Sequence, residues 1–260
     1  MNVGTRHSAI LELLRAQGRV GVEALAHRFD VTTQTIRQDL RQLSDQGLAR
    51  RTHGGAMRIG ATSNREYADR RTRHGARKQQ IGHRAAGLIP NNCSVALNIG
   101  TTTEHVAQAL MGHDGLVVIS NNLNIITTLM GGSCRELVVM GGSVRQSDGA
   151  ITGRDALDVI ARYKVDFAVI GASALDDEGA VLDFDAREVD VARAILANAR
   201  TRVLVCDSSK FETTAPVRIC DVAELDYVIT DAPPPPGFAE AATAAETRIL
   251  LPDPVKEPTP

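Results

Sequence analysis

The chain has 260 residues and is nearly balanced in charge, with 29 Lys and Arg against 31 Asp and Glu. This length accommodates one small and one medium domain. The absence of Trp and an aromatic content of 3% argue against a stacking platform for single-stranded nucleic acid. No apolar run approaches the length of about 18 residues that a membrane span needs, and the first residues lack the apolar core of a signal peptide. We therefore expect a cytoplasmic protein with no membrane partner.

The charge is unevenly distributed along the chain. Residues 1–84 hold 16 Lys and Arg against 7 Asp and Glu, whereas residues 85–260 hold 13 against 24. Such polarity is typical of a basic DNA-binding module joined to an acidic module with another task. The alternative is a basic segment that only keeps the chain soluble.

The number and spacing of the cysteines indicate whether disulfides or a metal site are expected. The four cysteines are Cys93, Cys134, Cys206 and Cys220. They are widely spaced, form no C-x-x-C pair and stand near no cluster of histidines, so they are expected to be reduced and mostly buried thiols. The sequence predicts neither a disulfide framework nor a metal site, and no motif calls for a cofactor.

The N-terminal segment predicts a helix-turn-helix with a supporting helix before it. Residues 6–14 form a short amphipathic helix, and residues 23–30 form a second helix that buries Leu25, Ala26 and Phe29. A turn of three residues leads from there into a third helix. This succession of helices and turn is the arrangement of DNA-binding helix-turn-helix proteins.

The third helix has the pattern of a DNA-recognition helix. Ile36, Leu40 and Leu43 recur at i, i+4 and i+7 and form one buried stripe, and Thr32 can cap the first turn. The other face is rich in Gln and Arg, which can donate hydrogen bonds to base edges and phosphates. For this helix alone, a solvated polar surface would be the better interpretation. The neighbouring helices reverse that preference and favour DNA. The candidate contacts are Thr33, Gln34, Thr35, Arg37, Gln38 and Arg41.

A short hairpin with a basic edge follows this helix. Gly47 ends the helix, and residues 48–56 have the pattern of two strands joined by a turn. Arg50, Arg51 and His53 would then lie on a wing that touches the sugar-phosphate backbone. We assign residues 1–57 to a winged helix-turn-helix domain and residues 58–75, rich in Arg, to a basic linker.

From residue 76 the pattern changes to an α/β domain. Apolar strands are predicted at 94–99, 116–120, 136–140, 166–170, 202–206 and 226–230, and helices at 76–89, 104–110, 124–130, 154–163 and 186–198. Short apolar strands that alternate with helices indicate a doubly wound parallel sheet covered on both faces. We assign residues 76–251 to this domain and expect it to carry the oligomer contacts. The proline-rich segment 252–260 is predicted to be a disordered tail.

Small polar and charged residues cluster at the predicted ends of these strands. Ligands of open α/β sheets bind beyond the carboxyl ends of the strands, and a helix N-terminus there favours an anion. The segment Gly100–Thr103 leads directly from a strand into a helix. The alternative is ordinary turn chemistry, but so many polar strand ends together favour a pocket for a small phosphorylated polyol. The candidate residues are Asn98, Gly100, Thr101, Thr102, Thr103, Asn121, Asn122, Gly141, Gly142, Gly153, Glu188, Asp207 and Lys210.

The N-terminal residues resemble the DNA-binding signature of DeoR-type bacterial regulators. The matching positions are Arg6, Ile10, Leu14 and Thr32, followed by residues 35–40. One position departs from the family pattern, since Gln38 stands where the family usually has a basic residue. The departure concerns the contact made there and leaves the expected fold unchanged.

The C-terminal segment resembles the effector domain of the same family, which is related to ribose-phosphate isomerases and coenzyme A transferases. The matching stretches are 99–102, 141–142 and 152–153, with Glu188 and 207–210. Here Asn98 replaces the acid that the family generally has two residues before the Gly-Thr-Thr turn. A neutral Asn does not repel a phosphate, and the change weakens the case for isomerase-like proton transfer.

Within the family, the likeness is greatest to the members that control glycerol 3-phosphate metabolism. It rests on residues 121–124, 182–185, 188–189 and 230–235. The resemblance implies a repressor of glycerol metabolism genes that binds operator DNA and is released by glycerol 3-phosphate. Because a helix-turn-helix reader usually acts as a dimer on two half-sites, we expect a homodimer or homotetramer.

Two alternatives remain open. One is a repressor that answers another sugar phosphate. The other is an active sugar-phosphate isomerase or transferase with a DNA-binding appendage, in which Glu188, Asp207 and Lys210 perform proton transfer. The enzyme hypothesis leaves the N-terminal module without a use, so we favour the regulator and assign no catalytic residue.

Overall fold

The computed structural model describes residues 3–17, 19–45, 48–52, 54–58, 67 and 70–252. Its contacts divide the chain into two compact units, residues 1–69 and residues 70–260. Among the described residues, no helix combines the length and the apolar character needed to cross a membrane.

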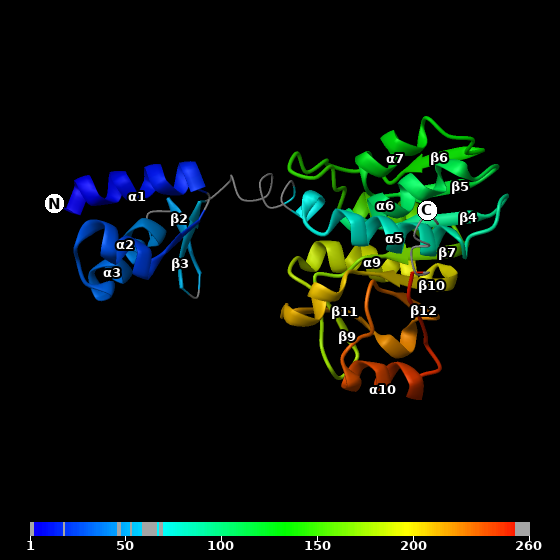
Figure 1. Cartoon of the computed structure of the whole chain (residues 1–260). Coiled ribbons are helices and arrows are strands. Elements are labelled where there is room, and N and C mark those ends of the chain that lie inside the picture. Colours follow the sequence, from blue (N-terminus) through cyan, green and yellow to red (C-terminus); the bar gives the residue numbers. More distant parts are fainter. Residues whose placement is uncertain are drawn as a thin grey trace, which may run out of the picture. The chain divides into compact units, whose positions relative to one another are not determined.

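The first unit is a winged helix-turn-helix, as predicted (Figure 1). Its elements are α1 Val3–Gln17, β1 Arg19–Gly21, α2 Val22–Phe29, α3 Thr33–Asp45, β2 Ala49–Thr52 and β3 Gly55–Arg58. The strands form an antiparallel sheet in the order β1-β3-β2. The sequence did not predict β1, because three residues are too few for a periodic signal.

The core of this unit joins the three helices to the sheet. The predicted stripe of α3 is buried, since Ile36, Leu40 and Leu43 are at most 1% exposed. They pack with Ile10 and Leu14 of α1 in one apolar cluster. The amphipathic spacing read from the sequence therefore sets which face of α3 is turned inward.

A glycine allows the wing to close on β1. Gly55 pairs with Gly21 across the sheet, and a Cβ on Gly55 would lie only 1.9 Å from the Val20 carbonyl oxygen. No side chain fits such an approach, so the hairpin packs this closely only with glycine at that position.

The second unit is a parallel α/β domain with a small additional sheet. Its helices are α5 Gly75–Ala86, α6 Thr101–Ala109, α7 Leu123–Leu129, α8 Arg154–Ile160, α9 Ala186–Ala197 and α10 Pro236–Ala244, with 3₁₀ turns η1 Leu110–Gly112, η2 Ser208–Glu212 and η3 Val222–Glu224. Its strands are β4 Ser94–Leu97, β5 Val117–Ser120, β6 Glu136–Val139, β7 Val165–Ile170, β8 Ala174–Leu175, β9 Ala180–Asp183, β10 Ala199–Val205, β11 Val217–Asp221, β12 Tyr227–Ile229 and β13 Arg248–Leu250.

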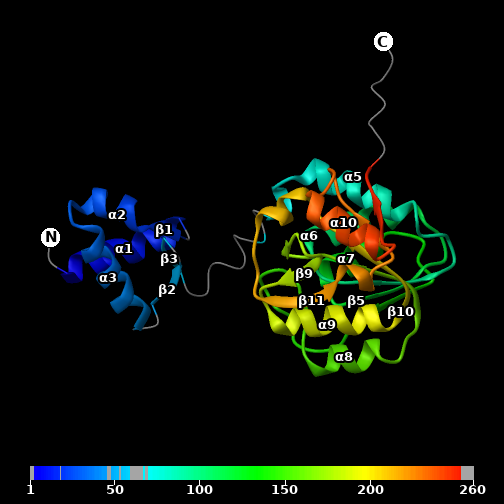
Figure 2. The same cartoon turned by 90° about the horizontal axis from the view of Figure 1, so that it is seen from below.

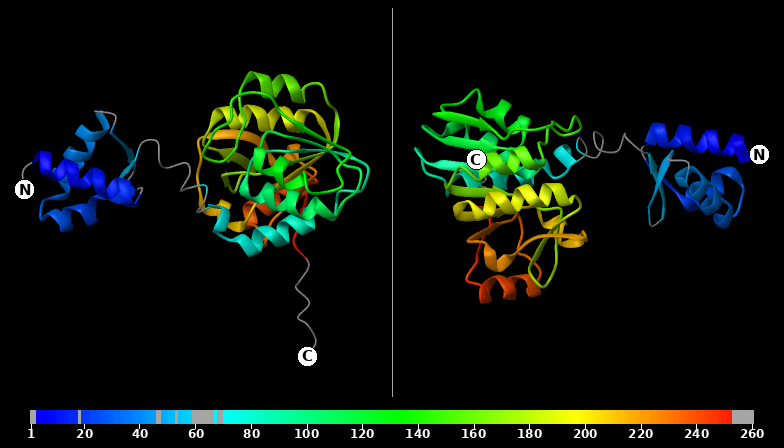
Figure 3. Two further views of the ribbon diagram at one scale, coloured as in Figure 1. Left: turned by 90° about the horizontal axis from the view of Figure 1, so that it is seen from above. Right: turned by 180° about the vertical axis from the view of Figure 1, so that it is seen from behind.

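Seven of these strands form one parallel sheet in the order β13-β12-β10-β7-β4-β5-β6. Figure 1 shows the strands from β6 to β12 in this order from top to bottom, and Figure 3 shows α10 at the opposite end of the sheet from β6. The chain runs outward from β4 to β6, returns to β7 and continues the other way. The strand order therefore reverses between β4 and β7, the position at which such sheets bind ligands.

Helices cover both faces of the sheet, as predicted. One apolar cluster contains Ile81 of α5, Val106 of α6 and Ile125 of α7. The other contains Ile160 of α8, Ile195 of α9 and Phe238 of α10. Figure 2 shows α8 and α9 together on one side of the sheet and α5 on the other. Burial on both faces explains why the strands appear in the sequence as continuous apolar runs.

The structure adds elements that the sequence did not predict. The six predicted strands are present as β4, β5, β6, β7, β10 and β12, whereas β13, α10 and the small antiparallel sheet β11-β9-β8 were not foreseen. The strands of that sheet have two to five residues, and β13 has three, so none offers a clear period. The predicted tail beyond residue 252 lies outside the described residues.

All four cysteines are free, and three of them are buried. This agrees with the prediction of reduced, mostly buried thiols. Burial raises the pKa of Cys93 to about 11 and of Cys206 to about 12. Among the described residues, no three His, Cys, Asp or Glu side chains group as they would to hold a metal ion.

Candidate DNA interface and effector site

The polar face of α3 is open to solvent. Gln34, Arg37, Gln38 and Arg41 are all exposed, whereas Thr33 and Thr35 are half-buried. Thr32 caps the helix, because its hydroxyl oxygen accepts a hydrogen bond from the Thr35 amide at 3.1 Å. The exposed side chains begin in the first turn of a capped helix, where recognition helices contact base edges.

The wing places two of the predicted backbone contacts on β2. Arg50 and Arg51 pair in register with Met57 and Ala56 of β3. The side chains of Arg50 and Arg51, and all of His53, lie outside the described part of the structure. Their contact with the sugar-phosphate backbone stays a prediction.

The carboxyl end of β4 carries a glycine-threonine turn that opens α6. Gly100 precedes the helix with φ of +153°, and the Thr103 hydroxyl donates to its carbonyl oxygen at 2.7 Å. Thr102 and Thr103 are buried. Asn98 is 4% exposed, and its side-chain oxygen has no hydrogen-bond partner among the described residues. A buried acceptor without a partner is costly, so Asn98 is ready to accept a donor such as a ligand hydroxyl.

A buried lysine that the sequence analysis missed lies against this turn. The Lys78 ammonium, 3% exposed, donates to the Thr101 hydroxyl at 3.0 Å and to the Arg70 carbonyl oxygen at 2.5 Å. It also lies 4.0 Å from the Asp207 carboxylate. Lys78 thus brings a positive charge from α5 to the N-terminus of α6.

Close packing of α5 on α6 sets this position. A Cβ on Gly82 would lie 2.5 Å from the His105 carbonyl oxygen, so the two helix backbones nearly touch there. Lys78 stands one turn before Gly82, and Thr101 one turn before His105. The buried side of α5 consists of Lys78, Ile81, Gly82, Ala85 and Ala86. In the sequence, the signal for Lys78 is a lysine that falls in register with the apolar residues of an amphipathic helix.

Burial and neighbouring charges shift the pKa values of Lys78 and Asp207. Burial lowers the pKa of Lys78 to about 8, although Asp207 opposes this shift. Burial alone would raise the pKa of Asp207, but the Ser209 hydroxyl and the charges of Lys210 and Lys78 hold it below its usual range. The Lys210 ammonium makes no ion pair with the described residues, and its main-chain amide donates to the Asp207 carbonyl oxygen at 3.1 Å.

The side chains of the two asparagines after β5 make hydrogen bonds to other parts of the same unit. Asn121 accepts from the Ile99 amide at 2.9 Å and donates to the Ile151 carbonyl oxygen at 3.2 Å. Asn122 caps α7 and donates to the Glu104 carboxylate at 3.2 Å. Both side chains are fully buried. They hold the β4 turn and the following loops together at the predicted site.

An arginine in the loop after β6, which the sequence analysis missed, connects Glu188 to the carboxyl edge of the sheet. Arg145 donates to Asp148 and to Glu188, both at 2.6 Å, and lies 3.5 Å from Asp185. Burial raises the pKa of Glu188 despite the charge of Arg145. The glycines predicted here, Gly141, Gly142 and Gly153, belong to the same connection; Gly142 has φ of +124° and Gly153 has φ of +106°.

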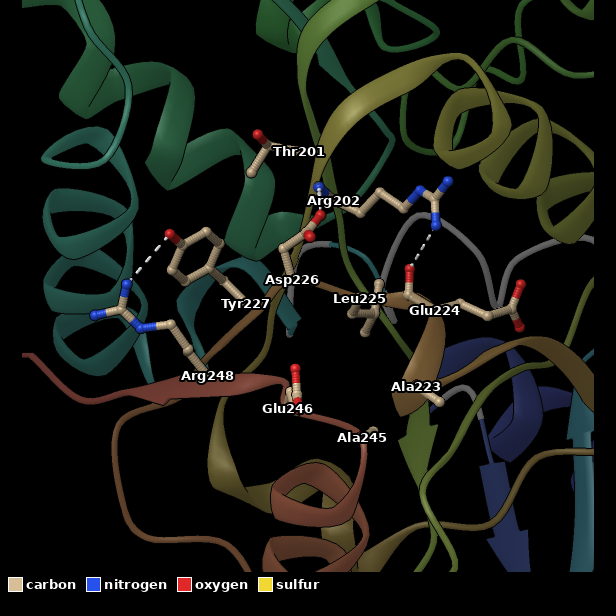
Figure 4. Close-up of a pocket in the computed structure, with 10 residues that line it drawn as sticks. All are labelled: Thr201, Arg202, Ala223, Glu224, Leu225, Asp226, Tyr227, Ala245, Glu246 and Arg248. Carbon is tan, nitrogen blue, oxygen red and sulfur yellow. Dashed lines mark hydrogen bonds between the residues drawn. The ribbon is translucent and has the colours of Figure 1, made fainter.

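A polar cavity lies on the amino side of the sheet, away from the carboxyl edge. It has a volume of about 400 Å³ and includes Arg202, Glu224, Tyr227 and Arg248 in its lining (Figure 4). These residues belong to the middle of β10, to the amino ends of β12 and β13 and to the turn η3. The cavity contains none of the predicted site residues. Its arginines are engaged with neighbours, Arg202 with the Glu224 carbonyl oxygen and Arg248 with the Tyr227 ring. That the effector binds at the carboxyl edge stays a prediction.

Comparison with known proteins identifies the family. The description "DeoR-like helix-turn-helix domain" matches residues 6–62, and "DeoR C terminal sensor domain" matches residues 73–232. The chain belongs to the DeoR family. It is 40% identical over 246 residues to the glycerol-3-phosphate regulon repressor of Escherichia coli (strain K12), covering 95% of this chain and 98% of that protein. The protein of the same name from Haemophilus influenzae is 38% identical over 251 residues, covering 96% and 98%.

These relatives decide between the two classes considered from the sequence. Both DeoR-family relatives are repressors that match over nearly their whole length, so this chain is a DNA-binding transcriptional repressor. Ribose 5-phosphate isomerase A of Methanocaldococcus jannaschii shares 16% identity with a TM-score of 0.39, covering 53% of this chain and 55% of that one. That distant likeness carries no inference about activity.

Proposed function

We propose that this repressor controls genes of glycerol and glycerol 3-phosphate metabolism and leaves its operator when glycerol 3-phosphate binds the second unit. Two sets of observations support this. The relatives that match over nearly the full chain carry the glycerol-3-phosphate regulon in their names. The carboxyl edge of the sheet combines a buried ammonium, a helix N-terminus and an unpaired buried acceptor.

Each part of the effector has a matching group in the proposed site. The amides at the N-terminus of α6 and the Lys78 ammonium would bind the phosphate, since both favour negative charge. Asn98 would accept a hydrogen bond from a glycerol hydroxyl. The observation that carries the proposal is the placement of the Lys78 ammonium against Thr101, at the N-terminus of α6. A cation taken out of water calls for close anionic partners, and the Asp207 carboxylate lies 4.0 Å away.

The same lysine offers a route from effector to DNA. Arg70, whose carbonyl oxygen accepts from Lys78, is the first residue of the second unit after the boundary at residue 69. A phosphate that attracts the ammonium would weaken its bond to Arg70 and so change how the connecting chain is held. Linkage then requires that effector and DNA weaken each other's binding by the same factor, typically about 1–3 kcal/mol.

The repressor would act as a homodimer or homotetramer. A helix-turn-helix unit places a single recognition helix in the major groove, and two half-sites about one helical turn apart need two copies. We propose that the second unit carries the contacts between copies.

The test is release from operator DNA. A duplex selected by the full-length protein from a random library serves as the operator, and binding is titrated with glycerol 3-phosphate and with glycerol. We expect release by the phosphorylated compound alone, because the phosphate provides most of the attraction. Equal release by glycerol would rule out the phosphate site. Release by a pentose or hexose phosphate alone would identify a repressor that answers another sugar phosphate.

Turnover of triose and pentose phosphates, followed in the same incubations, tests the enzyme alternative. The carboxylates that a proton-transfer mechanism would use are engaged. Glu188 is paired with Arg145, and Asp207 accepts from the Ser209 hydroxyl. We expect binding without turnover.

A further inference from the structure

A buried ion pair joins the recognition helix to the helix that supports it. The Arg6 guanidinium of α1 donates to the Asp39 carboxylate of α3 through Nε at 2.6 Å and through Nη2 at 3.0 Å. The His7 ring lies 3.1 Å from the same carboxylate. Arg6 is 5% exposed and Asp39 3%. Both residues are among the positions that match the family's DNA-binding signature.

The electrostatics of the pair show that both charges are retained. Burial would raise the pKa of Asp39, but the hydrogen bonds from Arg6 and His7 and their charges hold it below its usual range. The hydrogen bond to Asp39 raises the pKa of Arg6. Two charges taken out of water are compensated only in good geometry, and a two-point bond between guanidinium and carboxylate is the geometry that does so.

Stability is a weak explanation for such a pair. Buried ion pairs are often matched or exceeded in stability by apolar residues of similar volume. The apolar cluster around Ile36, Leu40 and Leu43 already holds α3 in place. Apolar contact is non-directional, however, and tolerates small rotations of a helix about its axis. A forked hydrogen bond does not tolerate such rotations, because both N–H groups must keep pointing at the carboxylate oxygens.

The rotation of α3 matters for the residues that face DNA. Asp39 follows Gln38 directly and lies between Arg37 and Arg41 in the sequence, so all four move together when the helix turns. With a radius of about 6 Å, a rotation of about 20° displaces the end of a side chain by about 2 Å. Hydrogen bonds to base edges tolerate only a few tenths of an ångström.

We propose that Arg6 and Asp39 are positioning residues for sequence readout. The ion pair sets the rotation of α3 about its axis, so that Arg37, Gln38 and Arg41 meet base edges in the correct register, while neither Arg6 nor Asp39 touches DNA. It also neutralises a carboxylate that would otherwise stand on a helix approaching phosphates. This inference rests on the family assignment of DNA binding and does not depend on the effector.

The test compares operator discrimination with fold stability in the full-length protein. Arg6→Met/Asp39→Leu replaces the pair by apolar side chains of similar size, and Arg6→Lys keeps the charge but loses the fork. Glu12→Gln, on the exposed side of α1, is the matched control. Affinity is measured for a duplex selected by the parent protein and for a duplex of scrambled sequence, over a range of salt concentrations, together with the thermal melt.

We expect both variants to melt near the parent and to bind the scrambled duplex with unchanged affinity and salt slope. Their affinity for the selected duplex should fall at least tenfold, whereas Glu12→Gln should match the parent. A folded double variant that keeps the parental ratio of the two affinities would overturn the proposal. Full parental discrimination by Arg6→Lys would do so as well, since charge rather than geometry would then suffice. An equal loss on both duplexes would show a merely structural role.

Discussion

Replacement of the buried lysine, Lys78→Met, tests the effector site most directly. Methionine has a similar length and fills the same space between α5 and α6, but it carries no charge. Asp207 keeps the Ser209 amide at 3.2 Å and the Ser209 hydroxyl as partners, so the carboxylate is not left alone. The buried Asp207 carboxylate loses the charge of Lys78, while an ammonium no longer has to be desolvated. These two effects on the free energy of unfolding oppose each other, and a thermal melt shows that the variant is folded before its affinity is measured.

The effect on effector affinity follows from the contact that is removed. Lys78 lies 3.0 Å from the Thr101 hydroxyl, at the N-terminus where the phosphate is proposed to bind. A hydrogen bond from a charged donor contributes about 1.5–3 kcal/mol, which is a factor of about 10 to 150 in affinity. Calorimetric titration of the full chain with glycerol 3-phosphate should therefore show a dissociation constant raised by that factor.

A neighbouring residue provides the control. Arg77 precedes Lys78 on α5, is half-exposed and lies 3.4 Å from Asp231. Arg77→Met removes a positive charge from the same helix, but solvent screens this half-exposed charge, so it should contribute at most about 1 kcal/mol to phosphate binding. Its dissociation constant should change by about fivefold at most. If Lys78→Met is folded and binds glycerol 3-phosphate as tightly as the parent, Lys78 is not the phosphate ligand and the site is placed wrongly.

Four further predictions concern the effector site, the fold and the DNA interface. Because the pKa of Lys78 is about 8 and only the ammonium attracts phosphate, effector affinity in the parent should fall as the pH rises through that value, and Lys78→Arg should remove the dependence in the same titration. Thr102→Val leaves a phosphate oxygen without a donor, which should weaken effector binding by about 1–3 kcal/mol. Operator binding should be normal while release needs more effector; loss of DNA binding by the folded variant would show that Thr102 also supports the DNA-bound state. Gly82→Ala forces a Cβ to within 2.5 Å of the His105 carbonyl oxygen, and chemical denaturation should show a free energy of unfolding lowered by about 1–3 kcal/mol. Arg37→Ala should weaken operator binding by about 1–3 kcal/mol, whereas Arg50→Ala should weaken selected and scrambled duplexes alike and reduce the salt slope; parental operator affinity in the Arg37 variant would exclude α3 as the reader.

Local patterns in the sequence were sufficient to predict the winged helix-turn-helix and the parallel sheet with helices on both faces. The spacing of Ile36, Leu40 and Leu43 determines the buried face of α3, and the same residues leave Arg37 and Arg41 exposed. Apolar strands alternating with helices predicted the doubly wound sheet. These features depend on residues within one or two turns of each other, so short-range periodicity records them.

The tertiary structure alone decided how charged residues meet. Lys78 reaches Thr101 and Asp207 only because α5 packs on α6 at Gly82 and because β4 and β10 end at the same edge of the sheet. Arg145 finds Glu188 across 43 residues of chain. A sequence shows that such a residue is charged, and sometimes that its position is buried, but not which distant group compensates the charge. The partner is set by the packing of whole elements, which no local spacing encodes.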